Sequence, residues 1–196
     1  MGSWGTVADW LVALGTIVLA IVAVFQKTIR DLFYRPKLDV SVKTEPPDCV
    51  AVPLNNLNGS FVANLVYLRL WIENKGNKTA KNIEVYAKEL RRRRADNSFE
   101  RVNTFPPMNL KWTNSELIYF PNIAPEMGKH CDIGHIADPQ HRNLIQEYLS
   151  WKTHSNQRTL LSFDLMVKPN NGSHIIDEGE YNLDILIAAE NSRPIK

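Results

Sequence analysis

The chain opens with an unbroken hydrophobic stretch and then changes to a pattern in which hydrophobic and polar residues alternate. Residues 10–25 carry no charge. A helix over residues 7–25 would be roughly 28 Å long, just enough to cross the hydrocarbon core of a bilayer. We therefore predict a transmembrane helix over residues 7–26, with residues 1–6 as a short N-terminus outside the cytoplasm.

The first residues lack the features of a cleaved secretory signal. Such a signal has a basic n-region and a cleavage site made of small residues. Residues 1–9 contain no Lys or Arg, and no clean cleavage site lies between Ala20 and Gln26. We therefore predict that the helix is retained in the mature protein.

Basic residues gather on the carboxyl side of the hydrophobic stretch, at Lys27, Arg30, Arg35 and Lys37. By the positive-inside rule, the residues from 27 onward lie in the cytoplasm. The prediction is a single-pass protein of the inner or plasma membrane. Residues 27–36 form a basic juxtamembrane linker in it, and residues 37–196 form a cytoplasmic domain.

One face of the predicted helix carries only small or polar residues, at steps of four and three: Asp9, Ala13, Thr16, Ala20, Ala23 and Lys27. This spacing places them on one side of a helix. Small residues let membrane helices approach closely, and threonine can form a hydrogen bond across the contact. We predict that this is a helix-association face. The alternative is that alanine is simply common in membrane helices.

Beyond Pro36, hydrophobic residues recur at every second position, which is typical of strands with one buried face. The alternation is visible at residues 38–42, 68–72, 83–87, 161–167 and 181–187. Asn and Gly in residues 74–79 favour a turn between two of these strands. We expect seven to nine strands that form a sandwich.

The segment WIENKGNKTAKNIEVY resembles the strand, Asn-x-Gly turn and strand of bacterial immunoglobulin-like domains of the cell-adhesion-related type. The matching positions are Asn74, Gly76, Ala80, Asn82 and Val85. A turn with Pro, Glu and Gly at residues 125–128, and Gly179 with Tyr181 before the last strand, are similar to further parts of those domains. The resemblance implies an immunoglobulin-like β-sandwich in a bacterial single-pass membrane protein; it implies no activity.

A short helix is predicted within the β-rich part. Asp138 is a good N-cap and Pro139 a good first residue of a helix at about 139–152. The apolar stripe of this helix is made of Leu144, Ile145, Tyr148 and Leu149. The predicted fold class is therefore mainly β: an N-terminal transmembrane helix followed by an immunoglobulin-like β-sandwich with one inserted short helix.

Four neighbouring residues have side chains that can ligate a metal: His130, Cys131, Asp132 and His135. Their spacing lacks the paired C-x-x-C or H-E-x-x-H pattern of zinc sites. In a strand, His130 and Asp132 face one side and Cys131 faces the other. We favour a polar edge strand with a buried cysteine, and we predict no metal and no other cofactor.

Only two cysteines, Cys49 and Cys131, occur in the chain. Small secreted domains held together by disulfides usually carry more, so two isolated thiols suit a reducing compartment. One disulfide between them stays open at this point.

A run of four arginines follows Leu90 and is predicted to cap a β-hairpin. With its basic neighbours it forms a basic contact tip, which consists of Lys88, Arg91, Arg92, Arg93, Arg94 and Arg101. Such a tip suits contact with anionic lipid headgroups, an acidic partner or a phosphate. The alternative is a hairpin tip whose charges are only solvated.

Charge and motifs narrow the function classes. A net charge of +2 creates no general field for nucleic acid, and aromatic and basic residues do not interleave. The chain contains neither G-x-S-x-G nor G-x-x-x-x-G-K-[ST], so we predict no enzyme.

The predicted function is a membrane-tethered, non-enzymatic interaction or sensing module. Its expected partners are the lipid bilayer and either a protein partner or a second copy of the chain. The alternative is a bacterial membrane effector of the defence type, in which the β domain senses a ligand or partner and drives oligomerisation of the transmembrane helix.

Overall fold

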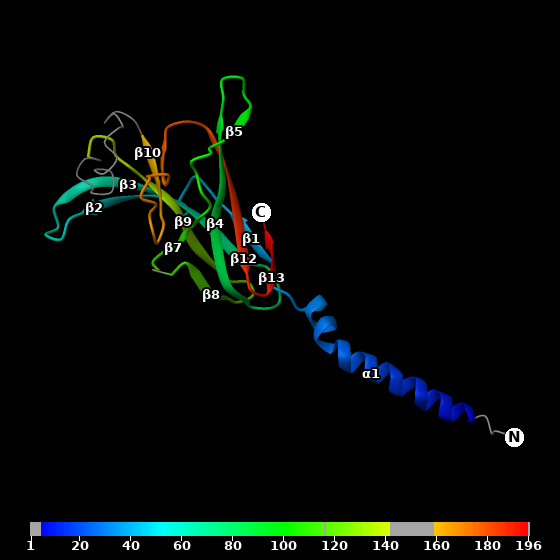
Figure 1. Cartoon of the computed structure of the whole chain (residues 1–196). Helices are drawn as coiled ribbons and strands as arrows, with labels where there is room; N and C mark the ends of the chain where they lie inside the picture. Colours follow the sequence, from blue (N-terminus) through cyan, green and yellow to red (C-terminus); the bar gives the residue numbers. More distant parts are fainter. Residues whose placement is uncertain (1–4, 116, 142–158, 196) are drawn as a thin grey trace. The chain divides into compact units, whose positions relative to one another are not determined.

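A computed structural model of the chain describes residues 5–115, 117–141 and 159–195. The chain divides into two compact units, residues 1–35 and residues 36–196. The first contains one helix, α1, and the second contains all the described strands (Figure 1). A mainly β fold with one N-terminal apolar helix is therefore confirmed.

Helix α1 spans Val7–Phe33 and begins with a capping box. The Thr6 backbone N–H donates to Asp9 Oδ2 at 2.6 Å, and the Asp9 N–H donates to Thr6 Oγ1 at 3.4 Å. Such a box satisfies N–H groups that the first turn leaves without partners. The acid at position 9 therefore has a role in starting the helix.

The helix is longer than its apolar part and runs through most of the segment that we predicted as a linker. Residues 26–33 include Gln, Lys, Arg and Leu, which are good helix formers. The first strong stop is Pro36, which disfavours helical geometry at the residue before it. The apolar part, Val7–Gln26, has the length and composition of a membrane span, a test that a signal sequence near an N-terminus also passes.

Seven strands form the first sheet, which we call sheet A. Its strand order is β1-β3-β9-β10-β11, with β2 also paired to β3 and β7 also paired to β9. All the pairings are antiparallel. The strands are β1 (Leu38–Ser41), β2 (Cys49–Asn55), β3 (Phe61–Asn74), β7 (Lys111–Trp112), β9 (Gly128–Ala137), β10 (Leu160–Phe163) and β11 (Ile175–Asp177).

Six strands form the second sheet, sheet B. Its order is β13-β12-β4-β5, and β6 and β8 also pair with β4. The strands are β4 (Ala80–Arg93), β5 (Phe99–Arg101), β6 (Met108–Asn109), β8 (Tyr119–Ile123), β12 (Tyr181–Ala189) and β13 (Ser192–Ile195). The turn between β3 and β4 carries the chain from one sheet to the other (Figure 1).

The main core lies between the two sheets. Sheet A contributes Ile72, Trp112 and Phe163 to it, and sheet B contributes Ile83 and Ile187. These side chains are almost completely buried. Burial of this apolar surface is the main force that holds the two sheets together.

A second, smaller cluster contains Leu65, Ala137, Leu160 and Ile175. Leu65 pairs with Ala137 across β3 and β9. Because side chains alternate along a strand, Leu65 lies on the same side of β3 as Tyr67 and Arg69, and opposite the side that carries Leu70 and Ile72. Sheet A is therefore partly covered on its outer face as well.

Several details differ from the sequence-based predictions. The described residues form thirteen strands, not seven to nine, because strands of two or three residues are too short to show periodicity. The first strand exists, but only Leu38 is buried while Val40 is exposed. The strand predicted at 161–167 ends at Phe163.

The inserted helix predicted at about 139–152 is not tested as a whole. Residues 139–141 form a turn. Residues 142–158 lie outside the described part of the chain.

Candidate functional site: a polar pocket on the outer face of sheet A

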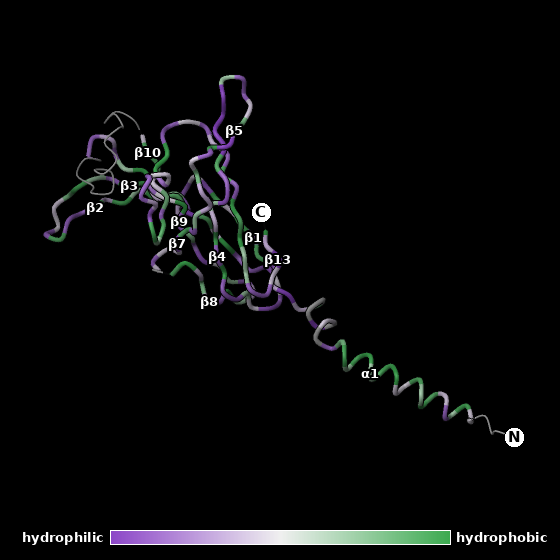
Figure 2. The backbone as a smooth tube through the Cα atoms, in the orientation of Figure 1, coloured by the Kyte–Doolittle hydropathy of each residue, from purple (hydrophilic) through white to green (hydrophobic). Residues whose placement is uncertain are grey.

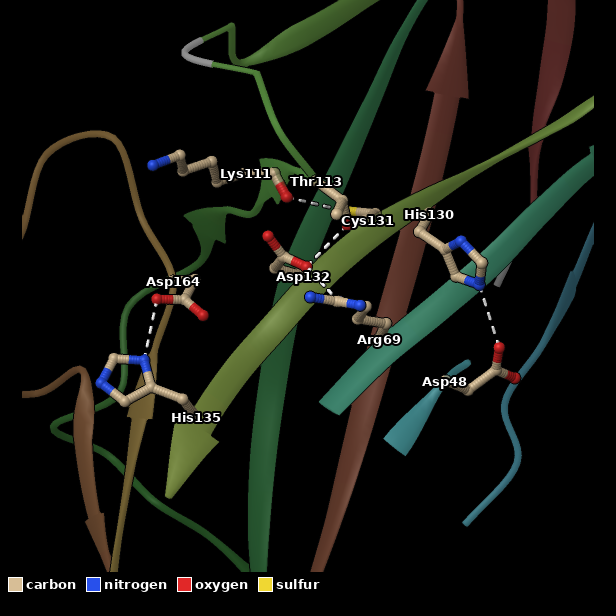
Figure 3. Close-up of polar contacts among 9 residues, drawn as sticks. All are labelled: Asp48, Arg69, Lys111, Thr113, His130, Cys131, Asp132, His135 and Asp164. Carbon is tan, nitrogen blue, oxygen red and sulfur yellow. Dashed lines mark hydrogen bonds and ion pairs between the residues drawn. The ribbon is translucent and has the colours of Figure 1, made fainter. Parts of the chain in front are cut away.

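A row of polar side chains crosses the outer face of sheet A (Figure 3). The register pairs Arg69 on β3 with Asp132 on β9, and Asp132 with Lys111 on β7. Directly opposed residues on antiparallel strands lie within side-chain reach of each other. One acidic residue is therefore paired in register with two basic residues across three neighbouring strands, and its carboxylate contacts one of them, Arg69.

Asp132 is the centre of this row. Its Oδ1 accepts a hydrogen bond from Arg69 Nε at 3.1 Å and another from Thr113 Oγ1 at 2.6 Å. The Arg69 guanidinium also lies over the Tyr67 ring, at 5.5 Å from its centroid. Asp132 is 8% exposed, and a buried carboxylate needs such partners to stay in the fold. The pair of Arg69 and Asp132 is thus satisfied internally.

A β-bulge in β9 brings a histidine to this same face. Leu68 pairs with Gly134, and the next residue, Arg69, pairs with Asp132, so Ile133 is the extra residue. Strict alternation would place His135 on the opposite side from Asp132. The bulge reverses this, and His135 pairs with Tyr67 at a ring-centroid distance of 5.5 Å.

His135 is oriented by an acid from beyond β10. Its Nδ1 lies 3.0 Å from Asp164 Oδ1. The other carboxylate oxygen, Asp164 Oδ2, is buried and has no hydrogen-bond partner among the described residues. A buried acceptor without a partner is costly, so this atom marks a place where a donor would be stabilised.

A second histidine–acid pair lies at the other end of β9. His130 Nε2 is 3.0 Å from Asp48 Oδ1, and the His130 ring contacts Trp71 at a centroid distance of 4.7 Å. Figure 3 shows the two histidine pairs on either side of Asp132.

A pocket of about 570 Å³ opens beside this polar row. Its size is in the range of small-molecule sites. Its lining is mostly polar or charged and consists of Val52, Tyr67, Arg69, Lys111, Thr113, Asn114, Ser115, Asp132 and Asp164. We call it the sheet A pocket.

The four candidate metal ligands do not converge. His130 pairs with Asp48, Asp132 with Arg69 and His135 with Asp164, while Cys131 is buried in the main core. Within residues 5–115, 117–141 and 159–195, the structure holds no group of three or more His, Cys, Asp or Glu side chains placed to bind a metal. The predicted opposite orientation of Cys131 relative to His130 and Asp132 is confirmed.

Cys131 is chemically protected by its position. Its Sγ lies 3.4 Å from the carbonyl oxygen of Lys111. Burial, and secondarily the charge of Asp132, raises the pKa of the Cys131 thiol well above its ordinary value of 9.0. Cys131 therefore keeps its proton at neutral pH and is not an activated nucleophile. Both cysteines are free thiols, which settles the open question of a disulfide.

The arginines of the basic contact tip lie on the predicted hairpin, formed by β4 and β5, which is strongly hydrophilic (Figure 2). Most of them pair with acids. Arg91 contacts Glu89 and Asp184, Arg93 contacts Glu180, Arg94 contacts Glu100, and Arg101 contacts Glu89. Arg92 stacks on Tyr181 at 5.8 Å. The tip is thus less positive than its sequence indicates, and its contact role stays a prediction.

The proposed helix-association face lies along α1 and is exposed at its described side chains, which exclude Lys27. Thr16 Oγ1 donates to the Val12 carbonyl of its own helix at 2.8 Å, and Asp9 belongs to the capping box. The two polar residues therefore have local partners, and Ala13, Ala20 and Ala23 remain as the small contact residues of this face.

The sequence did not point to the sheet A pocket. Arg69 lies at a polar position of the alternation at residues 68–72, but nothing local marks Thr113 or Asp164 as its neighbours. When the chain is compared with protein-family models, curated proteins and solved structures, nothing matches. The immunoglobulin-like resemblance therefore remains a prediction, and the site has to be interpreted from its own geometry.

Proposed function

We propose that this protein is a membrane-tethered, non-enzymatic sensing or interaction module. The observation that carries the proposal is the apolar segment Val7–Gln26, none of which is buried within the chain. An exposed apolar helix of twenty residues is stable when lipid or another protein covers its side chains. We place the β unit in the cytoplasm, because basic residues follow the apolar segment.

In this proposal, the β unit binds the ligand or the protein partner. Its two sheets share a core, and the Asn-x-Gly turn of the immunoglobulin-like resemblance lies at the crossing between them. These observations support an immunoglobulin-like sandwich. The polar face of sheet A supports ligand recognition, because it joins charged side chains to a pocket. Among the described residues, the buried thiol of Cys131 is not activated as a nucleophile, which favours recognition over covalent catalysis.

The test uses the full chain, expressed with a C-terminal reporter in a bacterial host. We expect the protein to stay in the membrane pellet after alkaline carbonate extraction. Its intact mass should include residues 7–26. A reporter that is active only in the cytoplasm should be active. Release by carbonate, or a mass that lacks the apolar segment, would refute the tether; reporter activity outside the cytoplasm would refute only the orientation.

A second candidate is a membrane effector in which α1 associates with other copies of itself. It is favoured by the exposed small residues of the α1 face. Expression of such an effector with its stimulus should arrest growth and depolarise the membrane, whereas a passive tether should do neither.

A further inference from the structure

The charges of the sheet A pocket are balanced in number, but they do not all neutralise one another. Arg69 and Lys111 are its cations, and Asp132 and Asp164 are its acids. Arg69 and Asp132 bind each other directly. The ammonium group of Lys111 makes no ion pair with any described residue. Asp164 is held by His135 through Oδ1 only. One ammonium group and one carboxylate oxygen therefore remain for a ligand.

Lys111 and Asp164 lie side by side without neutralising each other. The Lys111 backbone N–H donates to the Asp164 carbonyl oxygen at 3.0 Å, so the two residues are neighbours on adjacent segments. Their side chains form no ion pair, and Asp164 instead holds His135 through Oδ1. Figure 3 shows the Lys111 side chain extending away from Asp132 on the side of the sheet where Asp164 lies.

The unpartnered oxygen of Asp164 defines the first requirement for a ligand. Asp164 Oδ2 is buried and lacks a donor among the described residues. The side chains that cover this oxygen have to move for a ligand N–H group to reach it, and that group would then form a charge-assisted hydrogen bond. Lys111 defines the second requirement, because its ammonium group favours an anion nearby.

A ligand that carries only a positive or only a negative charge would pair with one of these two groups and leave the other without a partner. A polyanion would be opposed by Asp132 and Asp164, and a polycation by Arg69 and Lys111. Val52 and Tyr67 add a less polar wall, which can receive the aliphatic or aromatic part of a small molecule.

We propose that the sheet A pocket binds a small zwitterion of the amino-acid type, with its ammonium group on Asp164 and its carboxylate group on Lys111. The inference rests on the proposed sensing role of the β unit, for which it names the ligand class. It does not depend on the orientation of the protein in the membrane.

The test is binding to the full chain in detergent micelles, followed by calorimetry and by thermal unfolding. The probes are the individual L-amino acids, together with acetate, methylamine and trimethylglycine as compounds that lack one required group. AMP offers an exocyclic amine and a phosphate, and it tests whether a nucleotide supplies the same pair of groups. We expect at least one amino acid to bind more tightly than acetate, methylamine, trimethylglycine and AMP.

The variant Lys111→Met decides the role of the ammonium group. Lys111 makes no ion pair with the described residues, so its loss should leave the fold intact. Loss of a charge-assisted hydrogen bond should weaken amino-acid binding by about tenfold or more. The matched control is Lys81→Met on β4 of sheet B, which removes the same charge at an exposed residue outside the pocket lining and should bind like the wild type.

Asp164→Asn tests the other end, with the wild-type unfolding temperature as the check on folding, since Asp164 also holds His135. The proposal is overturned if no amino acid binds, if acetate or trimethylglycine binds equally well, or if Lys111→Met binds like the wild type. Tighter binding of AMP would overturn the amino-acid assignment. None of these results would alter carbonate resistance, so failure of the ligand proposal and failure of the membrane tether are distinguishable.

Discussion

Asn74 donates a hydrogen bond from Nδ2 to the backbone carbonyl of Ile123 at 3.0 Å and so connects the last residue of β3 in sheet A to the last residue of β8 in sheet B. Its Nδ2 also donates to the Lys78 carbonyl, and its Oδ1 accepts from the N–H groups of Lys37 and Gly76. The amide thus uses all four of its hydrogen-bonding positions. Asn74 is completely buried.

Asn74→Ala should destabilise the protein strongly. The substitution leaves several backbone groups without partners where both sheets meet, and we expect the free energy of unfolding to fall by about 3 kcal/mol. Chemical denaturation of the β unit, followed by tryptophan fluorescence, measures this. Asn122→Ala, at an exposed position of β8, is the control. Equal stability of the two variants would contradict the role of Asn74.

Gly134→Ala should disturb the bulge that orients His135. A Cβ at Gly134 would lie 2.2 Å from the Ser162 carbonyl oxygen, and β10 would have to move. Overpacking of this kind costs about 1–3 kcal/mol. Ala51→Val adds carbon atoms at an exposed position of β2 and should change little. Denaturation curves that superimpose on the wild type for Gly134→Ala would show that the contact is not restrictive.

Cys131 should make stability depend on alkaline pH. Its folded pKa is raised, so the folded thiol keeps its proton at pH values where the unfolded chain releases it. The contribution of the Cys131 thiol to the free energy of unfolding is complete below pH 9.0. As the pH rises from there towards the folded pKa, the free energy of unfolding falls by about 1.4 kcal/mol per pH unit. The difference in unfolding free energy between wild type and Cys131→Ala, measured across this range, should show that slope; a constant difference would argue against it.

The two cysteines should also react at different rates. Cys49 is partly exposed and Cys131 is buried. Iodoacetamide should therefore label Cys49 in the native protein and Cys131 only after unfolding, as peptide mass analysis can show. Rapid native labelling of Cys131 would mean that β9 opens readily.

The stability of the hairpin that carries the basic contact tip should depend on the ion pairs between its arginines and the neighbouring acids. The Arg94 Nε donates to Glu100 Oε2 at 2.7 Å across the hairpin. Exchanging the two residues, in the double variant Arg94→Glu with Glu100→Arg, keeps both the pair and the net charge, so the unfolding temperature should stay near that of the wild type. Arg94→Glu alone places two acids together and should lower it. Equal effects of the single and double variants would refute the pairing.

Helix association should be sensitive to the size of the residue at position 20. If α1 pairs through Ala13, Ala20 and Ala23, then Ala20→Leu should reduce chemical crosslinking of the full chain in membranes, because a larger side chain holds the helices apart. Leu19→Ala, which makes the reverse change in size on the neighbouring face, should crosslink like the wild type. Unchanged crosslinking of Ala20→Leu would exclude this face as the contact.

Part of the architecture followed directly from local patterns. The long apolar stretch predicted α1, and alternation predicted β3, β4 and β12, because a membrane span and a half-buried strand each require a repeated residue type along the chain. The turn after Asn74 was predicted from the asparagine and glycine residues that favour turns. The end of α1 was missed, because the polar residues after Gln26 still favour a helix.

The sheet A pocket depends on contacts between residues far apart in the sequence. Arg69 and Asp132 are 63 positions apart, and His135 and Asp164 are 29 apart. The bulge at Ile133 reverses the alternation of β9. The residue types around Ile133 do not predict this bulge. The sequence by itself therefore determined which segments are apolar helix and which are strand. Only the tertiary structure decided which charges meet, because strand register and bulges are set by packing of the whole sheet.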